Sequence, residues 1–462
     1  MAPRSAFRFG GGQSESRTRG PPARCIFRSG AHTERRRGER PLPSWGRRRA
    51  DYAFPVRRLL VLVSTVVFVD AMLFGALIPL VPGFADEFEL SKLQAGLLVG
   101  AFGGGALLGG VPGGLIAGRV GPKRAVVAGL LVLGLASIGF AVAGTPVALG
   151  VARFVQGFSS TMTWAGALSW ITVESPRARR GEILGSVFGI AVLGAILGPM
   201  FGALARVISI RATFGGVAIV ALALAAAAAA HPPARAEASS RGSLVRAVAD
   251  RAFVAGLWLN ALPAFLFGVL DVLAPLALDA RDYGAIAIGA VFLAAGLAEV
   301  GLNPVLGRVS DRRGRLLPIQ AALAVSVVVA ALLAIATAPL AIAALTVAAA
   351  VSFGGFYTPG MALVSDRAEL AGLSQGLAFG LTNSAWALGA LLGPSLGGAL
   401  ADWGGDATPY VLCSALCAAT LLMIVRRPGR PTARRETRQG RAASRSAGKR
   451  TSAQATSSGR RR

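Results

Sequence analysis

The stretch "LLVLVSTVVFVDAMLFGALIPLV", from Leu59 to Val81, is 23 residues long and has one ionisable side chain, Asp70, near its middle. As an α-helix rising ~1.5 Å per residue, it would measure about 34 Å, slightly more than the ~30 Å hydrocarbon core of a bilayer. The stretch therefore predicts a membrane-spanning helix with a carboxylate close to the bilayer midplane.

Asp70 is unusual because a charged residue at this depth costs ~2.5–3.5 kcal/mol on insertion scales. Such residues normally face a protein interior or a water-filled cavity and mark the path of an ion or substrate. We therefore expect Asp70 to lie on a proton or substrate path. The structural alternative is a neutral carboxylic acid that bonds a neighbouring helix.

The composition extends the membrane prediction to the whole chain, since 53% of residues are hydrophobic, 15% are charged and the mean hydropathy is +0.59. The net charge of +26 lies mostly in two tails. Residues 1–58 hold 15 Lys and Arg against 4 acids, and residues 426–462 hold 13 against 1. Both tails are predicted to be disordered and to meet the anionic lipid surface. No specific nucleic-acid partner is expected, although nonspecific RNA contact stays an alternative.

Hydropathy between the tails predicts helical segments long enough to span a bilayer. The twelve segments are 59–81, 94–117, 123–143, 146–170, 182–205, 208–230, 253–276, 284–307, 315–336, 339–362, 373–399 and 407–425. With both termini in the cytoplasm, inner loops hold 15 Lys and Arg and outer loops hold 4, so the positive-inside rule selects this orientation. The predicted fold is an all-α polytopic protein of the cytoplasmic membrane with twelve transmembrane helices.

The chain also repeats itself. "FGALIPLVP" at Phe74 realigns with "FGVLDVLAP" at Phe267, and "LGAILGPMFGALA" at Leu193 realigns with "LGALLGPSLGGAL" at Leu388. Parallel six-helix halves around a midplane cavity are a recurring plan of secondary transporters. The predicted organisation is a first half at 59–230, a cytoplasmic linker at 231–252 and a pseudo-symmetric second half at 253–425.

The segment "GRVSDRRGR", from Gly307 to Arg315, resembles the GxxxDRxGR loop of the major facilitator superfamily, and the resemblance covers about residues 57–427. It implies a latch that holds the cytoplasmic face shut in one state; a solvated charge run is the alternative. The implied latch residues are Gly307, Asp311, Arg312, Gly314 and Arg315, with Arg119 and Gly121 in the matching loop of the first half. That loop departs from the family, because Gly118 stands at the Asp position and Pro122 replaces a basic residue.

The fourth span contains "RFVQG", from Arg153 to Gly157, which resembles the RxxQG motif of proton-coupled members of the family. The resemblance places Arg153 and Gln156 on the proton or substrate path. A fixed positive charge changes the proton affinity of a nearby carboxylate, so Arg153 is the expected partner of Asp70. The alternative is an arginine that extends to the outer membrane interface.

The fifth span reads "GSVFGIAVLGAILGPMFG", from Gly185 to Gly202, and resembles the glycine-rich motif of antiporters. Its glycines give a flat face for close packing, and its proline allows bending where one half moves against the other. The eleventh span repeats the pattern, so tight packing alone is the alternative. The residues of interest are Gly194, Gly198, Pro199, Gly202, Gly393 and Pro394.

Further polar residues lie within the second half. Asp271 and Glu299 are expected on the proton or substrate path, and Asp271 takes the repeat position of Ile78. Residues placed to line a cavity are Asn260, Tyr357, Asn383 and Trp386. Cys413 and Cys417 lie one helical turn apart in an apolar segment, so they predict neither a disulfide nor a metal site.

The resemblance implies a secondary active transporter that works by alternating access. The first span and the antiporter-like fifth span are similar to the drug and amine exporter branch, so we expect proton-coupled efflux of a hydrophobic or cationic compound, with protons, the substrate and the bilayer as partners. A uniporter or symporter that imports a nutrient or organic anion is the alternative. The sequence has neither a P-loop nor an HExxH motif, so an ATPase or membrane enzyme is disfavoured. No cofactor or metal is predicted, and a monomer is expected.

Overall fold

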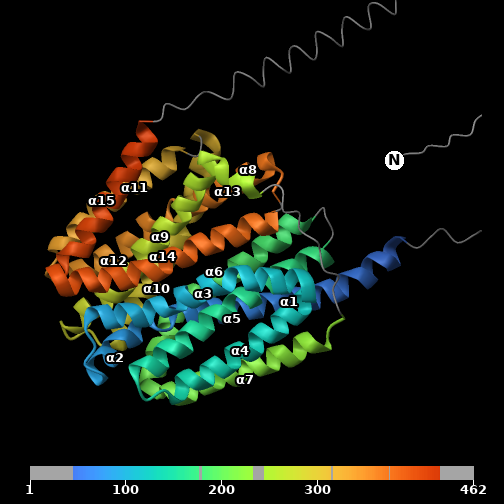
Figure 1. Ribbon diagram of the computed structural model, residues 1–462, viewed down its shortest axis with the longest axis horizontal. Coiled ribbons are helices and arrows are strands. Elements are labelled where there is room, and N and C mark those ends of the chain that lie inside the picture. Colours follow the sequence, from blue (N-terminus) through green and yellow to red (C-terminus); the bar gives the residue numbers. More distant parts are fainter. Residues whose placement is uncertain (1–44, 176–178, 233–243, 314–315, 374, 427–462) are drawn as a thin grey trace, which may run out of the picture. The chain divides into compact units, whose positions relative to one another are not determined.

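The computed structural model describes residues 45–175, 179–232, 244–313, 316–373 and 375–426, and each regular element within these ranges is a helix (Figure 1). The described residues from 51 onward form one compact unit, and residues 45–50 belong to a separate unit. The first elements are α1 (Trp45–Gly75), the 3₁₀ turn η1 (Ile78–Leu80), α2 (Val81–Glu87), α3 (Lys92–Val120), α4 (Pro122–Val142), α5 (Pro146–Glu174), α6 (Arg180–Ile208) and α7 (Ile210–Ala230). The later elements are α8 (Leu244–Ala249), α9 (Arg251–Asp279), α10 (Ala285–Arg313), α11 (Leu316–Ile335), α12 (Pro339–Gly354), α13 (Tyr357–Ala371), α14 (Gln375–Gly404) and α15 (Ala407–Val425).

Eleven helical stretches of the described chain are long and apolar enough to cross a membrane. They match eleven of the twelve predicted segments. The predicted fourth span, which corresponds to α5, is not among the eleven although this helix has 29 residues. Arg153, Gln156 and several hydroxyl side chains reduce the apolar content of α5. The all-helical membrane fold is confirmed, and the count of twelve spans stays a prediction.

Two predicted spans are broken by the chain's own chemistry. The first is not one helix over 59–81, because α1 ends at Gly75 and is followed by η1 and α2. Pro79 and Pro82 lie in this region, and proline cannot donate a backbone N–H to a helix. The tenth predicted span is likewise divided into α12 and α13 after Gly354. Glycine has a low helix propensity, and Gly354 is followed by a second glycine.

The boundary of the N-terminal tail also differs from the prediction. α1 begins at Trp45, so residues 45–58, predicted to be disordered, are helical. Arg and Ala, which are frequent here, are among the better helix formers. The rest of the two predicted tails, 1–44 and 427–462, lies outside the described residues.

Glycines let α6 approach α1 closely. A Cβ atom added at Gly194, Gly198 or Gly202 would lie 2.4, 2.5 or 1.8 Å, respectively, from a carbonyl oxygen of α1 or of the turn that follows it. Those oxygens belong to Phe68, Met72 and Ala76. Pro199 adds to the contact, because its Cδ would lie 3.1 Å from a Cβ at Gly75. Side chains at these positions would therefore force the two helices apart.

The pair α14 and α9 repeats this arrangement. A Cβ atom at Gly389 would lie 2.2 Å from the carbonyl oxygen of Ala261, and one at Gly393 would lie 2.3 Å from that of Phe265. Pro394 lies against α9 as Pro199 lies against α1, since its Cδ would be 2.4 Å from a Cβ at Gly268. The sequence repeat is therefore also a repeat of packing.

α3 and α14 run side by side (Figure 1) and contact each other along several turns. At one end, the carboxylate of Asp402 on α14 accepts the backbone N–H groups of Lys92 at 3.1 Å and Leu93 at 2.8 Å. The Lys92 ammonium also pairs with Asp406. The two hydrogen bonds to Asp402, called the Asp402 cap below, fix the first turn of α3 to the last turn of α14.

Candidate functional site

Asp70 lies on α1 and is buried, with 3% of its surface exposed. Its Oδ2 accepts two hydrogen bonds from α5, from Ser160 Oγ at 2.6 Å and from the indole Nε1 of Trp164 at 2.7 Å. Both donors are neutral side chains. The predicted carboxylate therefore faces another helix of the protein.

Arg153, on the same helix α5, is also buried. Its Nη1 donates to the carbonyl of Leu73 at 3.0 Å and to Gln156 Oε1 at 3.1 Å, and its Nη2 donates to the carbonyl of Phe74 at 3.2 Å. The last carbonyls of a helix lack partners within that helix, and α1 ends at Gly75. The guanidinium supplies donors to this helix end, so Arg153 does not extend to the membrane interface.

The structure brings Asp70, Arg153 and Gln156 together, as the sequence predicts. Arg153 is near enough to interact electrostatically with Asp70. The two side chains do not form an ion pair, since none of the bridges of 4.0 Å or less between described residues joins them. Asp70 is held by neutral donors and Arg153 by backbone carbonyls, one helical turn apart on α1.

Aromatic rings continue from this cluster toward α14. The Cζ of Arg153 lies 5.0 Å from the ring centroid of Phe102, a distance that permits a cation–π contact. Phe102 contacts Phe74 at 5.3 Å, and Phe74 contacts Trp386 of α14 at 5.1 Å between centroids. Trp386, one of the predicted cavity residues, thus links the surroundings of Arg153 to the C-terminal part of the chain.

The other two membrane acids lie apart from Asp70. Asp271 is buried on α9 with 7% of its surface exposed, and no hydrogen bond or ion pair to another described residue is found for its carboxylate. Glu299 on α10 is half-buried, and its carboxylate contacts Gly354 so closely that a Cβ there would lie 2.2 Å from Oε1. Tyr357 interacts electrostatically with Glu299.

The predicted asparagines occupy different environments. Asn260 on α9 is fully buried and donates from Nδ2 to the carbonyl of Gly256 at 2.7 Å, while its Oδ1 lacks a partner. Asn383 on α14 is half-buried. An unsatisfied buried amide oxygen is uncommon. Asn260 is therefore a stronger candidate than Asn383 for lining a polar path.

Most of the predicted latch lies outside what the structure describes. Gly314 and Arg315 fall outside the described residues, as do the side chains of Arg119, Asp311 and Arg312. Gly307 belongs to α10, and Gly121 joins α3 to α4 with φ of 97°, a conformation that favours glycine. The latch stays a prediction.

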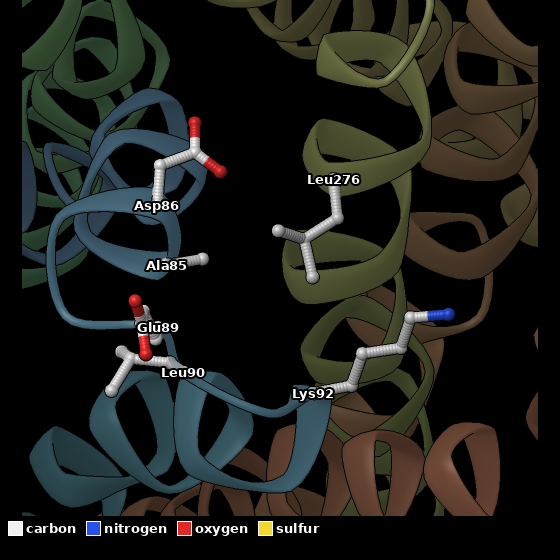
Figure 2. A pocket seen from close by; sticks show the side chains of 6 residues that line it. All are labelled: Ala85, Asp86, Glu89, Leu90, Lys92 and Leu276. Atoms are coloured by element: carbon white, nitrogen blue, oxygen red, sulfur yellow. The ribbon is translucent and has the colours of Figure 1, made fainter.

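A hollow of about 480 Å³ opens at the ends of α2, α3 and α9 (Figure 2). In Figure 2, Asp86 and Glu89 lie on the opposite side of the hollow from Leu276, and the Lys92 amine is directed away from both acids. None of the predicted path residues lines it. The described residues contain no group of three or more His, Cys, Asp or Glu side chains that could bind a metal.

Sequence reasoning missed Ser160 and Trp164, the two donors to Asp70. Their signal was spacing: Arg153, Gln156, Ser160 and Trp164 follow one another at intervals of three and four residues, which places them on one face of a helix. Neutral hydroxyl and indole groups do not stand out in an apolar span, whereas a charged residue does.

The model of the Major Facilitator Superfamily matches residues 63–378. The chain belongs to this superfamily. It is therefore a multi-pass membrane transporter of small molecules and not an enzyme, and it resembles the drug:proton antiporter branch.

Two curated relatives of this superfamily member differ in how much of each chain they match. The quinolone resistance protein NorA of Staphylococcus aureus is 25% identical over 373 residues, which cover 79% of this chain and 95% of NorA. The MFS-type transporter ppzB of Metarhizium rileyi is 28% identical over 164 residues, covering 34% of this chain and 33% of ppzB. The first alignment therefore spans nearly the whole relative and the second about a third.

Solved structures show the same superfamily fold. The nucleoside transporter NupG has a TM-score of 0.66 at 13% identity and covers 79% of this chain and 99% of its own. The human organic anion transporter MFSD10 has a TM-score of 0.60 at 16% identity and covers 80% and 99%, respectively. At these identities the likeness concerns the fold.

Proposed function

We propose that this chain is a proton-coupled secondary transporter that exports a hydrophobic or cationic small molecule across the cytoplasmic membrane by alternating access. The observation that carries the proposal is Asp70, a buried carboxylate near the middle of an apolar helix, held by two neutral donors. A carboxylate of this kind can exchange a proton or bind a cation, because no opposite charge is bonded to it permanently. The name of NorA, a quinolone resistance protein, supports efflux.

Arg153 gives this site a means of coupling. In the present conformation it bonds the end of α1 and acts on Asp70 through its electric field alone. Movement of α1 against α5 would change the separation of the two groups and therefore the proton affinity of Asp70. Such a change is what an antiporter needs to load a proton on one side and release it on the other.

We also propose the architecture of twelve spans in two six-helix halves, with both termini in the cytoplasm and the protein working as a monomer. The repeated packing of α6 on α1 and of α14 on α9 supports the two halves. α5 would be the remaining span, since its polar face is directed at α1 and away from lipid. The count of basic residues supports the orientation.

In this orientation the described contacts between the halves include the outer ends, where the Asp402 cap and the contact of Gly289 with Pro199 and Ala203 lie. They continue to the middle of the helices, where a Cβ at Gly110 of α3 would lie 2.9 Å from Ser384 Oγ of α14. Toward the inner ends, a Cβ at Gly189, Gly301 or Gly380 would meet no atom within 4 Å. This pattern supports a cytoplasm-facing conformation for the part of the chain that the structure describes.

The proposal is tested with Asp70→Asn in reconstituted vesicles. Asn has the shape of Asp and can still accept from Ser160 and Trp164, but it cannot be ionised. We expect substrate-induced proton release and proton-driven accumulation to be lost, while downhill counterflow of substrate survives. Asp86→Asn, at an exposed acid of the hollow, serves as the control and should transport normally.

Wild-type proton coupling in Asp70→Asn would contradict the coupling role. The direction of transport is decided separately. Proton-driven uptake into everted vesicles supports export, whereas accumulation in intact cells would favour the alternative of import by a uniporter or symporter.

A further inference from the structure

The polar face of α5 is directed at a single turn of α1. Arg153 bonds the carbonyls of Leu73 and Phe74, while Ser160 and Trp164 bond the side chain of Asp70. Ser160 and Trp164 are four residues apart, so they lie one above the other on the helix. Together they direct both donors at one oxygen, Oδ2.

Both donors are themselves held in place. The carbonyl of Ser160 accepts from Thr163 Oγ1 at 2.8 Å, within the same turn of α5. The Trp164 ring lies 5.9 Å from that of Phe188 on α6, which restricts the indole between two helices. A donor that is fixed in advance stabilises a carboxylate more than one that must be ordered when the proton leaves.

The charged surroundings of Asp70 are simple. Arg153 is the charged group that acts on it from α5. The part of α6 that packs closely on α1 and the turn after it, residues 194–202, contains no titratable side chain. The neutral hydroxyl of Thr163 also acts on Asp70. Ser160, Trp164 and Thr163 therefore share control of this carboxylate with one arginine.

We propose that Ser160 and Trp164 are positioning residues that set the pH at which Asp70 takes up its proton. The inference rests on the proposed function in assigning a transported proton to Asp70. Hydrogen bonds to the ionised form favour that form, so losing either donor makes protonation easier. A hydrogen bond to a charged group has an energy that corresponds to roughly one pH unit.

The test is a pH titration of the full-length protein in lipid vesicles, read from the infrared C=O band of protonated Asp70, which is identified by its disappearance in Asp70→Asn. Trp164→Phe removes the N–H and keeps an aromatic ring; Ser160→Ala removes the hydroxyl. We expect the midpoint to move to higher pH by about one unit in each variant, a tenfold rise in proton affinity. The pH profile of substrate-induced proton release should move in the same direction.

Matched controls come from the same helix. Trp170→Phe changes a buried tryptophan whose ring faces His231, and Ser159→Ala changes a buried serine whose hydroxyl bonds the carbonyl of Gln156. Both should titrate as the wild type does. If Trp164→Phe does not fold, Ser160→Ala carries the test.

An unchanged midpoint in a folded Ser160→Ala or Trp164→Phe protein would overturn the inference, as would an equal shift in the controls. The titration does not require transport, so it separates this inference from the proposed function. A shifted titration with coupled transport still present in Asp70→Asn would retain the positioning role and reject the coupling role.

Discussion

Arg153 shows how one buried charge can organise a helix end. Its planar guanidinium reaches two successive carbonyls of α1 and the amide of Gln156, which a single ammonium cannot do with the same geometry. The backbone groups it satisfies arise because α1 stops at Gly75 ahead of Pro79. Arginine at this position thus has a structural task in addition to its electrostatic effect on Asp70.

Arg153→Lys should therefore destabilise the protein although the charge is kept. A lysine would leave at least one carbonyl of α1 without a donor, which costs roughly 1–3 kcal/mol. Thermal unfolding of the purified protein measures the loss. Arg206→Lys, at an exposed arginine of α6, should unfold like the wild type. Equal stability of Arg153→Lys and wild type would show that the bonds to α1 contribute little.

At this scale the sequence predicts the charged members of the site and misses the neutral ones. Asp70 and Arg153 stand out because ionised groups are expensive in a membrane span. Ser160 and Trp164 have no such cost, and their partner lies 90 residues or more away along the chain. The different surroundings of the membrane acids were also hidden, since Asp271 and Glu299 look like Asp70 in sequence.

At the scale of helices, glycine spacing decides which faces meet. α6 has glycines on the face that contacts α1 and also at Gly189, where an added Cβ would meet no atom within 4 Å. Hydropathy predicted where the helices lie, because apolar length is a property of each segment alone. It did not predict the breaks after Gly75 and Gly354, because proline and glycine are tolerated inside many membrane helices.

Gly202→Ala and Gly189→Ala form a matched pair on α6. In the first, the new methyl group would lie 1.8 Å from the carbonyl oxygen of Ala76, so α1 and α6 must separate. We expect a loss of about 1–3 kcal/mol in stability, as is usual for overpacking. In the second, the methyl has room and alanine favours the helix, so stability should be equal or higher. Thermal unfolding of both purified variants checks this, and an equal loss in both would contradict the packing argument.

At the scale of the whole transporter, the Asp402 cap joins segments that the proposed mechanism must separate. Asp402 belongs to α14 of the second half, and the N–H groups it accepts begin α3 of the first half. Four N–H groups at the start of a helix lack partners within it, so a carboxylate from another helix is a strong cap. In the proposed orientation, opening the outer side would expose these N–H groups, and the cap would therefore stabilise the conformation closed at that end.

Asp402→Ala should shift the population toward outward-facing molecules. Loss of a cap costs about 1–2 kcal/mol, and 1.4 kcal/mol changes an equilibrium tenfold. The reporter is Ser395→Cys, at a half-buried position on α14. Ser395 faces Gly100 of α3, since its hydroxyl oxygen would lie 2.7 Å from a Cβ added at Gly100. The reporter is introduced after Cys25, Cys413 and Cys417 are replaced by alanine. A membrane-impermeant thiol reagent applied from outside should then label it roughly tenfold faster in Asp402→Ala.

Asp406→Ala is the control, because it breaks an exposed ion pair with Lys92, and such pairs contribute ~0–1 kcal/mol. Labelling at the same rate in Asp402→Ala and Asp406→Ala would mean that the bonds between α14 and the start of α3 do not hold the outer side closed.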